Sequence, residues 1–181
     1  EAVDIIIKEA GKPKAYAESE VKRCLATIEA AVVEAKRFVG ETIPIDFDAG
    51  EGKTAFTKRF PIGPILCITP FNFPAMVPMW MFPLAIACGN TFILKPSEKV
   101  PLTANRLAEI FAEAGLPEGV FNVVHGGREV VDALCTHPGI AAVSFVGSSR
   151  IAKHVYSLGC AHGKRVQAAG GAKNVLLVMP D

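Results

Sequence analysis

Apolar and polar residues alternate with two different periods along the chain. Between residues 21 and 35, apolar positions recur at helical spacing with charged residues between them, which predicts an amphipathic helix. From residue 43 to 60 the period shortens toward two: Ile43, Ile45 and Phe47 alternate with polar or small residues. A loop rich in Gly and Asp follows, and the extended pattern then resumes, so this segment is predicted to form a β-hairpin.

Short, continuous apolar runs replace the alternation after residue 64. Such runs are typical of strands that are buried on both faces. They cover residues 65–69, 91–94, 121–124, 141–146 and 175–178. Helical patterns separate them near 76–88, 102–114, 127–135 and 149–158. Strands alternating with helices predict an α/β fold with a doubly wound, parallel, Rossmann-like sheet. We therefore expect a helix and hairpin arm over residues 1–60 and an α/β domain, incomplete, over residues 61–181.

Composition excludes several classes of protein. The 181 residues carry 19 Lys+Arg against 18 Asp+Glu, so neither nucleic acid nor a membrane surface is an expected partner. Half of the residues are apolar, which argues against disorder. Five widely spaced cysteines without a C-x-x-C pattern indicate reduced thiols in a cytoplasmic protein. The chain starts with Glu1 and its last residues follow an apolar run, so we expect a piece of a longer protein.

The segment from Phe60 to Leu94 contains no charged residue over 35 positions, which is long enough to span a membrane. Six prolines interrupt it, and each proline inside a helix removes a hydrogen bond. We interpret the segment as a buried strand, a loop and a core helix of a soluble protein.

Polar residues follow the predicted strands, where parallel sheets bind ligands. Asn72, between two aromatic residues, is either a turn-forming residue or an amide donor for a developing oxyanion. Lys95 and Glu98 are either solvated surface or a ribose-binding pair, in which Glu98 accepts from the diol. A carboxylate at this place repels a 2′-phosphate, which favours NAD over NADP.

Gly147 and Ser148 follow the fourth strand. Glycine allows a close approach of the backbone, and Ser148 can cap the next helix, whose first N–H groups bind anions. The segment lacks the G-x-G-x-x-G pattern, so it is a weak dinucleotide signal. The four histidines lack metal-ligand spacing, and we predict no metal site. A nucleophile formed by Cys160 with His162 remains a distant alternative.

The ordered set of segments resembles the NAD(P)-dependent aldehyde dehydrogenases. The matching segments are Thr69–Pro74, Gly89–Thr91 leading into Lys95–Glu98, Phe145–Ser148 and Gly170–Asn174. From Ala75 onward the chain is most similar to methylmalonate-semialdehyde dehydrogenases, the CoA-acylating branch. Residues 1–60 are more similar to the hydrolytic branch, which leaves separate origins of the two parts open.

The resemblance implies a role for each matching residue. Asn72 would donate its amide to the oxyanion of the thiohemiacetal, and the hairpin would be an oligomerisation arm of a homo-oligomer. The implied cofactor-binding residues are Thr69, Phe71 and Gly170 at the nicotinamide, Lys95 and Glu98 at the adenosine ribose with Ser97 and Lys99 beside them, Gly147 and Ser148 at the pyrophosphate, and Ile151 at the adenine.

Two departures from the family pattern limit what the chain is expected to do. The nucleophilic cysteine of the family lies in a Gly-Gln-x-Cys segment, and no cysteine here has that context. Gln167, Ala168 and Ala169 stand where hydrolytic members carry a glutamate base, which favours transfer of the acyl group to CoA. We expect the cofactor-binding portion of an enzyme that oxidises an aldehyde or semialdehyde, inactive by itself. The alternative is a non-catalytic nucleotide-binding or assembly module.

Overall fold

The computed structural model describes residues 1–172 and 174–179. Seven helices and seven strands, with one short 3-10 helix, follow one another in these residues. In chain order they are α1 (Ala2–Ala10), α2 (Lys14–Ala35), β1 (Thr42–Ile43), η1 (Asp48–Gly50), β2 (Ala55–Phe56), β3 (Ile65–Ile68), α3 (Met76–Met79), α4 (Phe82–Ala87), β4 (Phe92–Lys95), α5 (Pro101–Glu113), β5 (Phe121–Val123), α6 (Arg128–Thr136), β6 (Ala142–Val146), α7 (Ser149–Ala161) and β7 (Arg165–Ala169).

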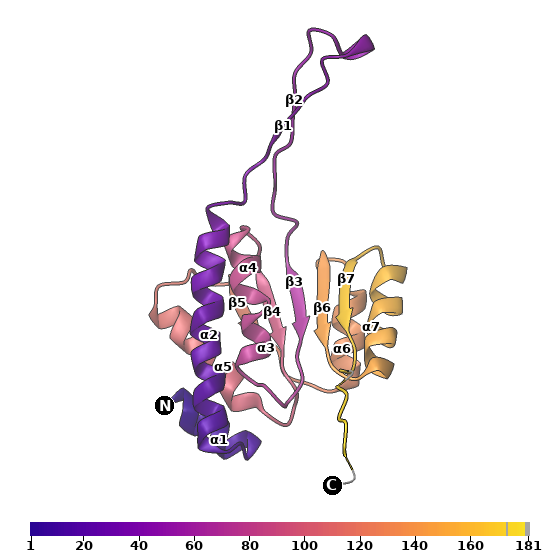
Figure 1. Cartoon of the computed structure of the whole chain (residues 1–181). Helices are drawn as coiled ribbons and strands as arrows, with labels where there is room; N and C mark the ends of the chain where they lie inside the picture. The colour runs from indigo at the N-terminus through magenta and orange to yellow at the C-terminus, as the bar shows by residue number, and fades with distance from the viewer. Residues whose placement is uncertain (173, 180–181) are drawn as a thin grey trace.

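Five parallel strands form the central sheet, in the order β5-β4-β3-β6-β7. The chain starts at the middle strand β3, builds outward through β4 to β5, and then returns to the other side of β3 for β6 and β7 (Figure 1). The order therefore reverses between β3 and β6, and such a switch point opens a crevice at the carboxyl ends of the strands. The predicted doubly wound parallel sheet is confirmed.

Helices cover both faces of this sheet, and each face has its own apolar core. α1 to α5 lie on one face, while α6 and α7 lie on the other (Figure 1). Alternate residues of β3 pack into the two cores. Cys67 belongs to a larger core cluster with Ile6 and Phe92, whereas Leu66 belongs to a smaller core cluster with Val143. Helices α1 and α2 thus share a core with the sheet, and the division of the chain at residue 60 stays a prediction.

Four phenylalanines contact one another in and beside the larger core cluster. Phe82 is fully buried, and its ring lies 4.7 Å from the ring centroids of both Phe111 and Phe121. Phe92 completes the group, with its centroid 5.7 Å from that of Phe82. These rings join α4, α5, β4 and β5, because edge-on and offset contacts between aromatic rings are favourable.

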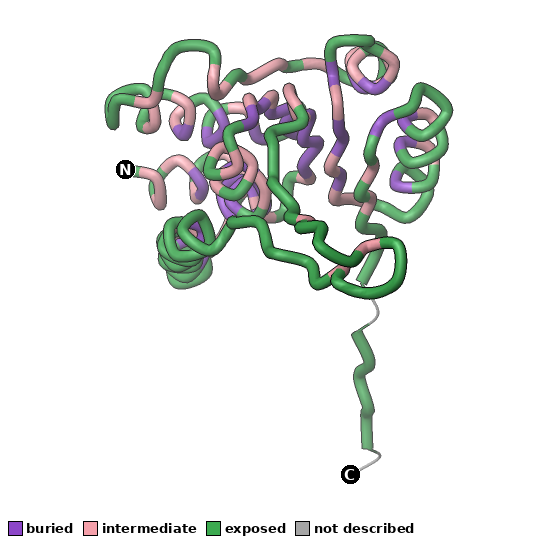
Figure 2. Tube along the Cα trace, turned by 90° about the horizontal axis from the view of Figure 1, so that it is seen from above, coloured by how far each residue is buried: buried purple, intermediate pink, exposed green. Residues whose placement is uncertain are grey.

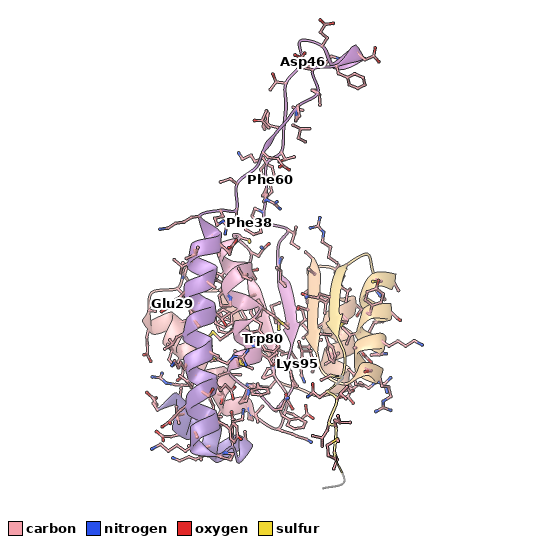
Figure 3. All side chains as sticks on the ribbon, viewed as in Figure 1. Glu29, Phe38, Asp46, Phe60, Trp80 and Lys95 are labelled. Carbon is pink, nitrogen blue, oxygen red and sulfur yellow. The ribbon has the colours of Figure 1, made fainter. Side chains whose placement is uncertain are left out.

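The predicted hairpin is confirmed, although its paired region is short. β1 and β2 pair antiparallel, with Thr42 opposite Phe56 and Ile43 opposite Ala55. The hairpin extends away from the sheet as a thin arm (Figure 1), and nearly all of its residues are exposed (Figure 2). Phe38 lies at its base and Asp46 near its tip (Figure 3). Its exposed apolar side chains include Phe47 and Phe56, at 82% and 74% exposure.

Three features differ from the sequence prediction. The helix predicted over 76–88 is divided into α3 and α4, because a turn at 80–81 separates them; the second helix begins at Phe82, with Pro83 in its first turn. The strand predicted over 175–178 is wrong: these residues form no strand, and Val175 is 93% exposed. Sequence analysis missed β7 and α1.

Among the described residues, no helix has both the length and the apolar character needed to cross a membrane.

Candidate cofactor site at the carboxyl edge of the sheet

The loops that follow the central strands are joined to one another at the carboxyl edge of the sheet. The N–H of Thr69, after β3, donates to the carbonyl of Lys95 at the end of β4, over 3.2 Å. The N–H of Gly147, after β6, donates to the carbonyl of Ala169 at the end of β7, over 3.1 Å. Backbone pairing continues into these loops, so the residues predicted from separate motifs lie along one edge.

A pocket of about 460 Å³ opens at this edge, between the sheet and helices α6 and α7. It has the size of a small-molecule site. Its lining comprises Ile68, Lys95, Glu98, Gly127, Arg128, Val131, Arg150, Ile151 and His154. Three of the predicted cofactor residues, Lys95, Glu98 and Ile151, therefore contribute to a single pocket. Figure 3 shows Lys95 near the carboxyl ends of the strands.

Lys95 and Glu98 form the charged part of the pocket. The Lys95 residue is 4% exposed, and its Nζ lies 3.7 Å from Oε2 of Glu98, whose side chain is 64% exposed. Burial lowers the pKa of Lys95, while the carboxylate of Glu98 opposes that shift. The pair thus presents a donor and an acceptor to the pocket. Ser97 lies between them in sequence, and its Oγ accepts the N–H of Lys99 over 3.3 Å.

The loop after β3 places its polar and aromatic groups at the surface. Thr69 is buried, whereas Phe71 is 50% exposed and Asn72 is exposed. The ammonium of Lys99 lies 4.7 Å from the centroid of the Phe71 ring, a favourable cation–π distance. The carbonyl of Asn72 accepts from Nζ of Lys12 over 2.7 Å. Asn72 and Phe71 do not line the 460 Å³ pocket, so they form a separate part of the edge.

Gly147 and Ser148 lie directly after β6, at the start of α7, and their role at the pyrophosphate stays a prediction. Ser148 occupies the N-cap position of α7, but its side chain makes no capping hydrogen bond, so the predicted side-chain cap is wrong. A Cβ added at Gly147 would lie 2.5 Å from Cζ of Phe145, and one at Gly170 would lie 3.2 Å from Cα of Ser149. A side chain at either position would therefore require Phe145 or Ser149 to shift. The first N–H groups of α7 remain available to an anion.

Sequence reasoning missed a polar wall of the pocket on α6 and α7. Nε2 of His154 lies 2.6 Å from Oδ1 of Asp132, and Nε of Arg128 lies 3.4 Å from Oδ2. The hydrogen bond from His154 is the main reason why the pKa of Asp132 is lowered. Arg150 adds a further cation. Helical periodicity could have shown only that these residues lie on helices, since their meeting depends on the packing of α6 against α7.

The cysteines lie outside the pocket. Cys67 and Cys135 are buried, and burial raises the pKa of the Cys135 thiol to about 11. Cys160 is exposed, and Nδ1 of His162 lies 2.9 Å from the carbonyl of Leu158. Among residues 1–172 and 174–179, no three His, Cys, Asp or Glu side chains are grouped to hold a metal ion.

Comparison with known proteins identifies the class to which this fold and edge belong. The model of the aldehyde dehydrogenase family matches residues 1–181, and the chain belongs to that family. Among curated relatives, malonate-semialdehyde dehydrogenase 1 of Oceanobacillus iheyensis is 54% identical over 181 residues. That match covers 100% of this chain and 37% of the relative, so the chain spans little more than a third of its length. One relative matches both parts, so separate origins are not required.

Solved structures give the same class. Methylmalonate-semialdehyde dehydrogenase of Oceanimonas doudoroffii is 45% identical with a TM-score of 0.90, over 96% of this chain and 35% of that one. A protein of Sinorhizobium meliloti, assigned as a methylmalonate-semialdehyde dehydrogenase and solved with NAD, is 47% identical with a TM-score of 0.89. That match covers 95% of this chain and 34% of that one. The chain is thus similar to semialdehyde dehydrogenases in sequence and in fold.

Proposed function

We propose that this chain is the cofactor-binding portion of an NAD-dependent aldehyde dehydrogenase that acts on a short semialdehyde in the cytoplasm. The observation that supports it most directly is the pocket at the switch point, which brings together Lys95, Glu98 and Ile151. Lys95 ends β4, Glu98 lies in the loop after it and Ile151 lies in the first turn of α7; the family resemblance assigns these residues to adenosine. The similarity to semialdehyde dehydrogenases supports the substrate class.

In this proposal each part of the edge holds one part of the cofactor. Lys95 and Glu98 bind the two ribose hydroxyls, with Ser97 and Lys99 supporting their loop. Ile151 packs on the adenine. The remaining proposed contacts are Gly147 and Ser148 at the pyrophosphate and Thr69, Phe71 and Gly170 at the nicotinamide. NAD supplies the hydride acceptor when it is bound.

Asn72 has the proposed catalytic role. Its amide donates to the oxyanion that forms when a cysteine thiolate attacks the aldehyde carbonyl, and such a donor contributes most where water is excluded. Cys67 and Cys135 are unsuited as that nucleophile, because burial disfavours their thiolates. The cysteine is therefore proposed to come from another part of the enzyme.

Transfer of the acyl group to CoA, rather than to water, is the proposed final step. Residues 167–169 precede Gly170 and contain no carboxylate. Without a base at this place, water is poorly activated, whereas a thiol is a good nucleophile near neutral pH.

The test of the cofactor proposal is calorimetric titration of NAD into the 181-residue chain. Ile151 is 36% exposed at the rim of the pocket, so Ile151→Asp should fold but should bind NAD at least tenfold more weakly. Tyr156→Asp is the matched control, because Tyr156 lies on the same helix, is 53% exposed and does not line the pocket. Equal losses in both variants, or no binding by the wild type, would contradict the proposal.

The alternative, an assembly module, rests on the arm. Its exposed aromatic side chains, among them Phe47 and Phe56, are suited to a second copy of the chain. We include homo-oligomerisation through this arm in the proposal. Two results together would favour the alternative, an assembly module that binds no cofactor. The chain would form oligomers that Phe47→Asp and Phe56→Asp disrupt, and it would not bind NAD.

A further inference from the structure

A buried ion pair near the start of the chain is attached to the loop that carries Asn72. Lys12 lies between α1 and α2, and Glu20 lies in the second turn of α2. The Glu20 side chain is 0% exposed and the Lys12 side chain is 12% exposed. Nζ of Lys12 and Oε2 of Glu20 form both a salt bridge and a hydrogen bond. A charged pair this deeply buried is costly unless further hydrogen bonds satisfy it.

Those further hydrogen bonds lead to the loop after β3 and to the first residue of α3, which follows it. Oε1 of Glu20 accepts the N–H of Ala75 over 2.9 Å and the N–H of Met76 over 3.1 Å. Nζ of Lys12 donates to the carbonyl of Asn72 over 2.7 Å. The same ammonium lies 4.1 Å from the centroid of the Phe73 ring. The pair therefore holds the loop on both sides of Phe73, from elements that lie more than fifty residues away in the sequence.

We propose that Lys12 and Glu20 are positioning residues for Asn72, which fix the backbone from which its amide donates to the oxyanion. This proposal rests on the catalytic role of Asn72 given above. An oxyanion donor is effective only in a narrow range of positions, and an error of 1 Å in placing a reacting group can cost about a hundredfold in rate. Within this chain, which spans about a third of its relatives' length, Asn72 is exposed, so packing against the described residues does not hold it. Its carbonyl contact with Lys12 supplies the missing restraint.

Glu20, like Glu9, accepts N–H groups at the start of a helix, and the contact of Lys12 with Asn72 is what distinguishes the pair. Glu9 accepts the N–H groups of Leu102 and Thr103 over 2.8 and 2.9 Å, at the start of α5. That contact also joins an N-terminal helix to a distant element, but α5 is not in the Asn72 loop. Glu9→Gln therefore serves as a control for lost stability without lost positioning.

The experiment is a double-mutant cycle on kcat in the complete enzyme that contains this chain. We expect Asn72→Ala to lower kcat by about a hundredfold, the usual cost of an oxyanion donor. Lys12→Met is expected to lower kcat by about tenfold through misplacement of Asn72. In the Asn72→Ala background, Lys12→Met should have no further effect, because there is no amide left to misplace. The KM for NAD should not change.

The outcomes separate the two proposals. If Asn72→Ala leaves kcat unchanged, the proposed role of Asn72 is wrong. If Asn72→Ala is slow but Lys12→Met lowers kcat by the same factor in both backgrounds, the positioning role is overturned. Glu20→Gln should loosen the loop, seen as faster hydrogen exchange at Ala75 and Met76, whereas Lys14→Met, which removes an exposed ion pair with Glu18, should change neither kcat nor exchange.

Discussion

Replacement of Glu98 by Gln should change the choice between NAD and NADP. The substitution keeps the shape of the side chain and removes its charge, and Lys95 keeps its buried position 3.7 Å away. A carboxylate that accepts hydrogen bonds from a ribose diol contributes about 1.5–3 kcal/mol. The Glu98 side chain is 64% exposed, so water competes, and the lower value applies. NAD should therefore bind about tenfold more weakly to the variant.

NADP should respond in the opposite direction. Two unit charges 4 Å apart repel by about 1 kcal/mol in a water-like environment, and a phosphate carries up to about two charges at pH 7. Removal of the Glu98 charge should thus strengthen NADP binding by about 2 kcal/mol, or roughly thirtyfold. Lys95 then faces the phosphate without the neighbouring carboxylate. In the wild type, Glu98 raises the pKa of Lys95 against the effect of burial. The variant lacks that carboxylate, so Lys95 loses its charge at a lower pH, and the gain in NADP binding should diminish at alkaline pH.

Isothermal titration of both cofactors into the wild type and the variant measures this change. The combined loss and gain predict that the preference for NAD falls by about three hundredfold. Glu113→Gln is the matched control, since the Glu113 side chain is also 64% exposed and does not line the pocket. The reasoning is refuted if Glu98→Gln alters both affinities by the same factor, or if the control shows the same change.

Three other predictions concern stability and thiol chemistry. Phe82→Ala should lower the free energy of unfolding by about 3–5 kcal/mol, measured by urea denaturation, because Phe82 is fully buried among aromatic rings. Ellman's reagent should label Cys160 rapidly in the native chain and Cys67 only after unfolding, as peptide mapping would show. The pKa of Asp132 is lowered by His154, so its stabilising effect is present above the ordinary Asp pKa of about 4. The difference in urea midpoint between wild type and Asp132→Asn should therefore shrink as the pH falls below that value.

The sequence alone predicted the sheet where strands are buried on both faces. Runs such as Ile65–Ile68 are continuous and apolar because helices cover both sides of the sheet. β7 escaped prediction because only one of its faces is covered. Val166 and Ala168 pack against the smaller core cluster, while Arg165 and Gln167 are exposed, so the strand looks polar. The apolar run at Val175 has the composition of a strand, but it pairs with no strand among the residues that the structure describes.

The candidate site was predictable to the extent that it follows strand ends. Lys95 and Glu98 were identified because they stand at or just after the end of a buried strand, whereas Ile151 was assigned through the family resemblance; the structure brings all three to one pocket. The pair formed by Lys12 and Glu20 could not be found in this way. Both residues look like ordinary charges flanking an amphipathic helix, and their burial appears only when α2 packs against the loop after β3.

The two core clusters on opposite faces of the sheet have a consequence for how the chain is made. All residues of the larger core cluster, from Ile6 to Leu107, precede those that cover the other face, which begin at Val131. β3, β4 and β5 can therefore assemble with α1 to α5 while synthesis continues, before β6 leaves the ribosome. At roughly 5–20 residues per second, Leu66 and Ile68 then face water for a few seconds until α7 arrives. A nascent chain that has not yet added α6 and α7 therefore presents one apolar face of the sheet, and an apolar surface of this kind is what a chaperone would recognise.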